Sequence, residues 1–198
     1  ALMVFCPVFN KENGIMSEFP GKGKVAVVKT SPETVLDDIA RVMELAGFRE
    51  ALPKGPTTAL KINISWQTWY PACSSTPWQL EGVGLALKKA GYADLVGVHN
   101  DTVVVSCREG TVRNHLAPVR ERYRGPIQYL SEPPTEWIRY TPKSKMLVLD
   151  RVFEKIGIQI PKLLLGKNVI HLPTVKTHVF TGTTGSMKNA FGGLLNLN

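Results

Sequence analysis

Short apolar, β-branched runs alternate along the chain with longer stretches whose apolar residues recur every three to four positions. The short runs are typical of buried strands and cover 24–29, 58–64, 94–100 and 168–172. Weaker strand patterns, divided by Pro-rich turns, cover 127–130, 137–140 and 146–149. Helices are predicted over 31–47, 76–91, 111–123 and from 186 towards 195.

The helical stretches have recognisable ends. Ser31 is expected to be the N-cap of the first helix, and a Thr-Pro pair at 76–77 opens the second in the same way. Glycines follow the last apolar residues of both helices. Pro118 would kink the third helix or end it early.

Strands that alternate with helices of this length predict the α/β class, with a mostly parallel sheet covered by helices on both faces. The length of 198 residues fits a single α/β domain over 1–198. We expect 1–23 to be an N-terminal extension. The Pro-rich segment 126–145 is expected to be an inserted hairpin or lid rather than a domain boundary.

The composition is typical of a soluble globular protein rather than of a disordered or membrane protein. Hydrophobic residues make up 43% and charged residues 20% of the chain, and no apolar run approaches membrane-spanning length. The formal charge of +8 favours anionic partners. Its basic residues are dispersed, apart from pairs and triplets in helical patterns, so a nucleic-acid partner is disfavoured and an anionic small molecule is preferred.

The three cysteines, Cys6, Cys73 and Cys107, are widely spaced and form no C-x-x-C motif. This pattern argues against a disulfide framework, a structural zinc site or an iron–sulfur cluster within this chain. A reducing, cytoplasmic setting is therefore expected. Because the sequence begins with Ala1 rather than Met, an upstream piece could have been removed, which leaves localisation open.

Polar side chains gather where the predicted strands end, and in open α/β sheets ligands bind beyond the carboxyl ends of the strands. Lys61 and Asn63 share one face of the second strand because side chains alternate. The third strand ends at His99, Asn100 and Asp101, and the last runs on to Lys176 and His178. These residues are predicted to point towards one edge of the sheet.

Several of these residues also have a structural interpretation. Asn63 matches a glycosylation acceptor by chance, and Asn100-Asp101 is a good turn pair. His171 lies between apolar neighbours inside a strand, which favours a packed core residue. Cys73 lies in a loop beside Ser74 and Ser75, but without a recognisable base it is not favoured as a nucleophile.

The segment 182–189 is the more specific signal. Glycines let a backbone approach a ligand, hydroxyls and amides donate hydrogen bonds, and a lysine beside a helix N-terminus favours an anion. The pattern is not a Walker A loop, because Gly185 is followed by Ser-Met-Lys-Asn. We interpret it as an anion cradle, the alternative being a polar turn with a solvated lysine. The predicted ligand-binding residues are Lys61, Asn63, Lys176, Thr177, Thr184, Gly185, Lys188 and Asn189.

Two stretches resemble the family catalogued as domain of unknown function 362. The first combines "LKIN" at 60–63, "STP" at 75–77 and the helix end "KKAGY" at 88–92. The second, "LPTVKTHVFTGTTGSMKNAFGG" at 172–193, is long and specific. The resemblance spans most of the chain, and the family's name records that its activity is not established.

Many members of that family carry a ferredoxin-like region with iron–sulfur cysteines, which this chain lacks. The resemblance therefore implies an iron–sulfur or redox partner in place of an internal cluster. Members of the family usually continue with more helix and strand, whereas this chain stops at Asn198. A truncated sheet, a partner chain or a missing C-terminal half would each account for that difference.

Three functional hypotheses follow, and the first is an enzyme-like domain. Lys176, His178 and Lys188 would bind an anionic small molecule or cofactor, and Asp101 or His178 would transfer a proton. In a variant, His99, Asp101 and His178 hold a divalent metal as a Lewis acid.

The second hypothesis is a non-catalytic ligand-binding or redox-partner domain that uses the same cradle. A basic nucleic-acid binder ranks third. The histidine and the aspartate favour the enzyme, because a passive anion pocket needs neither.

Overall fold

The computed structural model describes residues 4–6, 23–102, 104–123, 125–141 and 148–192. Its centre is a five-stranded sheet with the order β1-β7-β2-β3-β4. The strands are β1 (Val4–Cys6), β2 (Thr58–Ile62), β3 (Leu95–His99), β4 (Ile127–Tyr129) and β7 (Asn168–Leu172). The last four run parallel, and β1 is an antiparallel edge strand beside β7. This arrangement confirms the predicted α/β class.

The central strands are buried on both faces, which explains their nearly continuous apolar sequence. Every residue of β2 and β7 is buried. Thr58 pairs with Asn168 and Ile62 with Leu172, so these two strands end level with each other. The residues that come directly after these two strands in the chain therefore lie at the same edge of the sheet.

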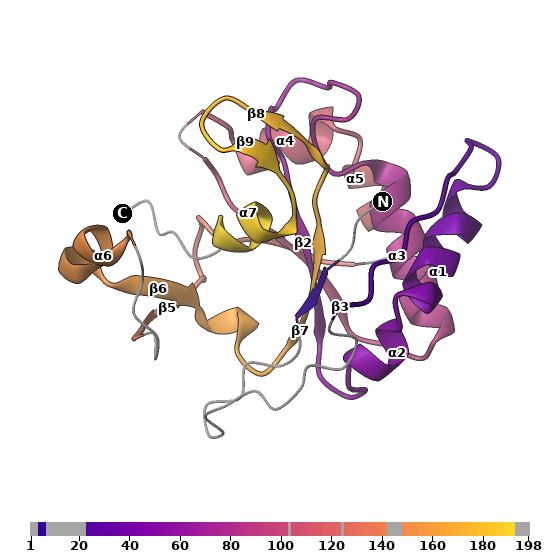
Figure 1. The fold of residues 1–198 in the computed structure, drawn as a ribbon, viewed down its shortest axis with the longest axis horizontal. Coiled ribbons are helices and arrows are strands. Elements are labelled where there is room, and N and C mark those ends of the chain that lie inside the picture. The colour runs from indigo at the N-terminus through magenta and orange to yellow at the C-terminus, as the bar shows by residue number, and fades with distance from the viewer. Residues whose placement is uncertain (1–3, 7–22, 103, 124, 142–147, 193–198) are drawn as a thin grey trace.

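One face of the sheet is covered by helices (Figure 1). They are α1 (Val35–Leu45), α2 (Phe48–Ala51), α3 (Pro77–Lys89), α4 (Cys107–Arg113) and α5 (Ala117–Tyr123). The main core lies between this layer and the sheet, with Met43, Phe48, Val83 and Leu87 against Ile170. Burial of these apolar side chains is the main stabilising contribution to the fold.

The other face carries a second, smaller core around Val98, Val169 and Leu130, packed by Trp137 and Leu163. It is covered by shorter elements, some of which lie to the left in Figure 1. They are β5 (Trp137–Tyr140), α6 (Asp150–Ile156), β6 (Ile158–Pro161), the 3-10 helix η1 (Lys162–Leu164), β8 (Lys176–His178), β9 (Gly182–Thr184) and α7 (Ser186–Phe191). No helix in the described part of the chain is long and apolar enough to cross a membrane.

Two predicted segments take part in the fold in an unexpected way. The extension 1–23 contributes β1 to the main sheet, and its residues 1–3 and 7–22 lie outside the described part. The segment 126–145 forms no hairpin of its own in its described part. Its first strand, β4, joins the main sheet, and β5 pairs with β6 from further along the chain.

The predicted buried strand at 24–29 is wrong. These residues form no strand, and the side chains of Val25 and Val27 are 73% and 79% exposed. The reason is competition for the sheet edge, because β1 occupies the position beside β7. The segment instead lies against α1, where Val28 borders a groove with Val35 and Ile39.

Helix boundaries differ from the prediction at two places. The first helix begins at Val35 with Thr34 as N-cap, because residues 32–34 form a turn in which Ser31 Oγ contacts Thr34 Oγ1 at 3.1 Å. The predicted helix over 111–123 is two helices, α4 and α5. The break falls at His115, whose φ of 59° is left-handed, and Pro118 lies in the first turn of α5, where its missing N–H costs nothing.

The other helix and strand predictions fare unevenly. Thr76 caps α3 as expected, since its hydroxyl accepts from the Gln79 N–H. The predicted strand at 146–149 lies partly outside the described residues, and Val148 and Leu149 lead into α6 instead. The end of the last predicted helix, at 193–195, also lies outside them.

Candidate functional site

The carboxyl edge of the parallel strands is held together by serine and threonine hydroxyls. Ser75 Oγ accepts from the Asn63 N–H at 2.9 Å and donates to the Leu172 carbonyl, so it joins the ends of β2 and β7. The Thr174 hydroxyl donates to the Ser74 carbonyl at 2.9 Å. The hydroxyl-rich loop after β2 therefore has a structural role in this edge.

Lys61 is the central residue of this edge. It lies near the end of β2, directly opposite His171 of β7, and only 4% of its surface is exposed. Its Nζ donates to the Ile62 carbonyl at 3.2 Å and makes no ion pair with a carboxylate in the described part of the chain. Burial disfavours the charged ammonium and lowers its pKa to about 8.

Asn189 of α7 connects Lys61 and His171. Its Nδ2 donates to the Lys61 carbonyl at 3.0 Å and lies 3.5 Å from Nδ1 of His171. Because an amide nitrogen only donates, Nδ1 of His171 is the acceptor and the neutral ring carries its proton on Nε2. Burial, and secondly the Lys61 charge, lower the pKa of His171 to about 4.

His99 lies on the opposite face of the sheet, towards α4. Its Nε2 is 2.9 Å from the Thr111 hydroxyl, its Nδ1 has no partner among the described residues, and its ring meets Tyr129 edge to face. Burial and the nearby Lys61 ammonium lower its pKa to about 3, against the opposing influence of Asp101. His99 is therefore a neutral, packed side chain.

Asp101 is engaged in holding the start of α4. Its Oδ1 accepts from the Cys107 N–H at 2.6 Å, and its own N–H donates to Ser131 Oγ at 2.7 Å. Burial first, and the adjacent Asp101 carboxylate next, raise the pKa of the Cys107 thiol. Cys107 is thus a protonated thiol rather than a nucleophilic thiolate.

The hairpin β8–β9 and the short helix α7 bring three basic side chains together. Lys176 and His178 are two residues apart on β8 and share a face, and the Lys188 charge from α7 reaches both. Partial burial lowers the pKa of His178 and of Lys188, and the neighbouring lysines lower both further. Neither lysine makes an ion pair within the described residues.

His178 is oriented by the hairpin turn. Its Nδ1 accepts from the backbone N–H groups of Phe180 and Thr181 at 3.2 and 3.3 Å. The neutral ring therefore carries its proton on Nε2, which has no hydrogen-bond partner among the described residues. An Nε2–H donor and two ammonium groups thus lie on the same small surface.

Two hydroxyls beside this surface are buried without partners. They belong to Thr184 and Ser186, on either side of Gly185. A Cβ added at Gly185 would meet no atom within 4 Å, so there is open space beside this residue. Its φ of −169° is ordinary extended backbone, so glycine is not required there by conformation.

A family model described as "Domain of unknown function (DUF362)" matches residues 58–197. The chain belongs to this family. Searches among curated proteins and among solved structures find no match. The matched segment of this DUF362 chain begins with β2 and includes every residue of the carboxyl edge described above.

The predicted site residues of this DUF362 chain fall into separate groups. Lys61 and Asn189 lie together with His171, and Lys176, His178 and Lys188 lie together on the hairpin side. Consecutive residues of α7, Lys188 and Asn189, join these two groups. Thr184 and Gly185 border the second group.

The remaining predicted residues lie elsewhere. Asn63 donates to Ser65 Oγ within its own loop at 3.1 Å, and Thr177 is exposed on the hairpin. His99 and Asp101 lie towards α4. Within the described ranges, no three His, Cys, Asp or Glu side chains lie close enough to share a metal ion.

His171 is the site residue that sequence reasoning set aside as core. It is indeed buried, but it contacts Asn189 and lies opposite Lys61. The parallel pairing of two strands that each carry one basic residue near their carboxyl end was the available signal. The register that pairs them, however, follows from tertiary structure.

Proposed function

We propose that this chain binds a small anionic molecule at the carboxyl edge of the sheet, between the β8–β9 hairpin and α7. The molecule carries a phosphate or carboxylate group. The observation that carries the proposal is the group formed by Lys176, His178 and Lys188. It combines two ammonium ions without a carboxylate partner in the described residues and an imidazole whose Nε2–H is directed by the hairpin turn.

The electrostatics of this group favour an anion. The Lys176 charge lowers the pKa of Lys188, and both lysine charges lower the pKa of His178, so the two ammonium groups repel each other. A bound anion would relieve that repulsion and accept hydrogen bonds from all three side chains. The buried hydroxyls of Thr184 and Ser186 would gain partners if the loop at Gly185 closed on the same ligand.

His178 is the residue we assign to proton transfer in an enzyme acting at this edge. Its lowered pKa keeps the ring neutral at pH 7, and its Nε2 faces the proposed ligand while the turn holds Nδ1. Asp101 is less suited, because its carboxylate is committed to the backbone of α4. Lys61 and His171 are buried next to this surface, because both contact Asn189, the residue that follows Lys188 in α7.

Thermal unfolding with added anions tests the binding proposal. Inorganic phosphate, pyrophosphate, citrate, sugar phosphates and nucleotides form the panel. An anion at 100 times its Kd should stabilise the protein by about 2.7 kcal/mol, which corresponds to roughly 5–10 °C for a chain of this size. Lys176→Ala and Lys188→Ala should abolish the shift.

Lys89→Ala, at the exposed end of α3, is the matched control and should keep the shift. If no anion of the panel raises the unfolding temperature, or if Lys89→Ala removes the effect as fully as Lys188→Ala, the proposed site is wrong.

A second candidate function is the docking of an acidic redox protein. The observation that favours it is a set of exposed apolar side chains around the same basic group. Val179 and Phe180 at the hairpin tip are 85% and 89% exposed, and Met187 on α7 is 88% exposed. Apolar side chains surrounded by basic ones suit a protein surface of opposite charge.

The two candidates separate experimentally. A small acidic ferredoxin serves as the probe for docking, measured by surface plasmon resonance at two salt concentrations. Phe180→Ser should weaken ferredoxin binding about tenfold and leave anion-induced stabilisation unchanged. Ferredoxin binding that is absent, or that is unaffected by both Phe180→Ser and salt, rejects docking.

A further inference from the structure

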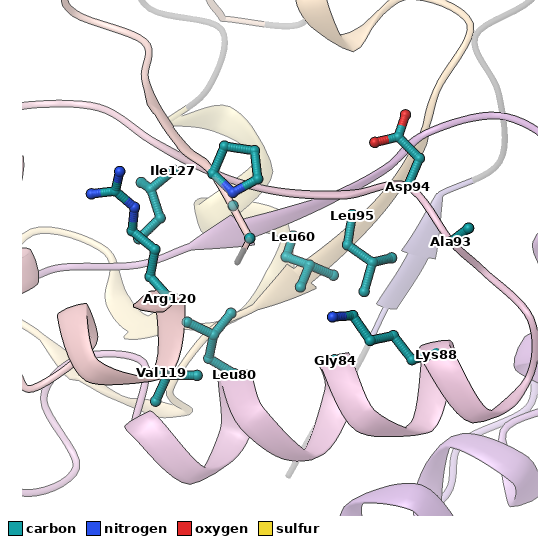
Figure 2. A pocket seen from close by; sticks show the side chains of 13 residues that line it. Leu60, Leu80, Gly84, Lys88, Ala93, Asp94, Leu95, Val119, Arg120 and Ile127 are labelled. Atoms are coloured by element: carbon teal, nitrogen blue, oxygen red, sulfur yellow. The ribbon is translucent and has the colours of Figure 1, made fainter. Parts of the chain in front are cut away.

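A pocket of about 190 Å³ lies on the helix-covered face of the sheet, between α3 and α5 (Figure 2). Its floor is formed by the amino-terminal halves of β3 and β4, so it lies away from the carboxyl edge. The walls combine the apolar side chains of Leu60, Leu80, Leu95, Val119 and Ile127 with three charged residues, Lys88, Asp94 and Arg120.

Gly84 keeps this pocket open. It lies in the interior of α3, a helix of 13 residues, where glycine is unfavourable relative to alanine. A Cβ added at Gly84 would meet no atom within 4 Å, whereas one added at Gly82 would approach the Ile39 side chain to 2.9 Å. Close helix packing therefore explains Gly82, and it does not explain Gly84.

The opening of the pocket is asymmetric in charge. Arg120 of α5 is exposed at one side, and its guanidinium makes no hydrogen bond or ion pair within the described residues. Asp94 stands at the other side and accepts a hydrogen bond from the Thr57 hydroxyl. Figure 2 shows these two side chains at opposite ends of the opening. Lys88 of α3 also lines the pocket, and Figure 2 shows its ammonium group directed towards Leu95. The two cations favour an anionic group in the pocket, and the Asp94 carboxylate disfavours one at its own end, so the Arg120 end is the more favourable position.

We propose that this pocket binds a small carboxylate whose body is a single apolar ring or a short branched chain. A dry cavity of about 150 Å³ holds one benzene molecule, so the volume here suits one ring with a small substituent. The ring would lie against Leu60, Leu80 and Val119, beside Gly84, and the carboxylate would pair with the Arg120 guanidinium. This site is separate from the carboxyl edge and does not depend on the function proposed there.

Fluorine NMR with 4-fluorobenzoate tests the proposal on the full chain. The probe's signal should broaden or shift on addition of protein, with a Kd of roughly 1 mM or below. Gly84→Leu fills the pocket and should weaken binding at least tenfold. Arg120→Met should weaken 4-fluorobenzoate about tenfold while changing the binding of neutral 4-fluorobenzyl alcohol less than twofold.

Three variants make the result interpretable. Arg151→Met removes an exposed arginine from α6, on the other side of the sheet, and should leave binding unchanged. The double variant Lys176→Ala/Lys188→Ala removes the carboxyl-edge cations and should also leave it unchanged. Gly84→Ala adds one methyl group without a clash and should weaken binding less than Gly84→Leu, which covers the case in which the leucine variant does not fold.

Several outcomes would overturn the assignment. The first is the absence of any 4-fluorobenzoate response. The second is a response lost in Lys176→Ala/Lys188→Ala and kept in Gly84→Leu, which would move the probe to the carboxyl edge. The third is equal weakening by Arg151→Met and Arg120→Met, which would reduce the arginine effect to net charge.

Discussion

Lys61, His171 and His99 are buried basic side chains at the ends of three adjacent strands. Burial shifts all three towards their neutral forms, and the Lys61 charge adds to the shift of both histidines. Among the described residues, no carboxylate influences the pKa of Lys61 or His171, and Asp101 is the one that opposes the shift of His99. Protonating any of these three side chains therefore destabilises the folded protein, so their contribution to the free energy of unfolding depends on pH.

Lys61→Met should stabilise the protein at pH 7, because methionine fills a similar volume without an ammonium group to desolvate. The folded pKa of about 8 lies below the ordinary 10.5, so the unfolded chain binds the additional proton between those values. Stability of the natural protein should therefore rise as pH increases through that window, by about 3 kcal/mol relative to Lys61→Met.

Urea unfolding of both proteins at pH 7 and pH 10 measures this difference, because other titrating groups cancel between them. An equal dependence on pH in the two proteins would show that Lys61 is charged and solvated in the folded state.

His171→Gln should make the protein less sensitive to acid. The folded pKa of about 4 lies below the ordinary 6.5, so stability from the neutral imidazole is present above 6.5 and lost as pH falls towards 4. The natural protein should lose about 3 kcal/mol more than the variant between pH 7 and pH 4. Urea unfolding across that range tests this, with His115→Gln, at an exposed helix break, as the control.

At the scale of elements, α7 and the β8–β9 hairpin connect the sheet edge to the surface. α7 has six residues and inserts Ser186 and Asn189 into the protein, while Met187 remains exposed. Isolated helices of that length are not stable in water, so tertiary contacts such as the Asn189 hydrogen bond to Lys61 fix its position. The position of Lys188 therefore depends on the neighbouring Asn189 contact.

Replacing each of the two glycines of α3 by alanine should change the free energy of unfolding in opposite directions. Gly84→Ala should raise the free energy of unfolding by about 0.8–1 kcal/mol, because alanine is the better helix former and finds open space. Gly82→Ala should lower it by about 1–3 kcal/mol, because the new methyl group overlaps the Ile39 side chain.

Urea unfolding compares the two alanine variants under one condition. Destabilisation by both would indicate that the space beside Gly84 is filled in solution.

For the whole molecule, the sequence predicted the parallel sheet well because its central strands are fully buried and read as continuous apolar runs. It failed at 24–29, where the same apolar pattern lies on the surface because β1, a strand of three residues, takes the edge of the sheet. Such short strands carry too little periodicity to be recognised. Which segment takes the edge of the sheet is decided by competition between segments. The local sequence pattern of one segment carries no information about that competition.

The candidate site was predictable in its location more than in the roles of its residues. Strand ends and the 182–189 segment led to Lys61, Lys188 and Asn189. The hydrogen bonds that commit Asp101 to Cys107 and His178 to its own turn follow from backbone geometry. The contact between Asn189 and His171 joins residues 18 positions apart, and Ser75 reaches Leu172 across 97 positions. Partners at such separations are set by the fold.

Because the net charge is +8, anions could be attracted by the overall charge of the protein or bound by the group of Lys176, His178 and Lys188. Two double variants distinguish the alternatives at equal net charge. Lys176→Glu/Lys188→Glu and Lys54→Glu/Lys89→Glu each change the charge by −4, from +8 to +4. Lys54 and Lys89 precede β2 and β3 and thus lie at the opposite edge of the sheet.

At physiological salt, exposed charges are screened beyond about 8 Å. The hairpin variant should therefore weaken the best anion of the panel at least tenfold, and the remote variant less than about threefold, as measured by isothermal titration calorimetry. Equal losses would mean that the general field of a basic protein attracts the anion. A loss confined to the hairpin variant would localise recognition to Lys176 and Lys188, because the two variants have the same net charge and differ only in which lysines are replaced.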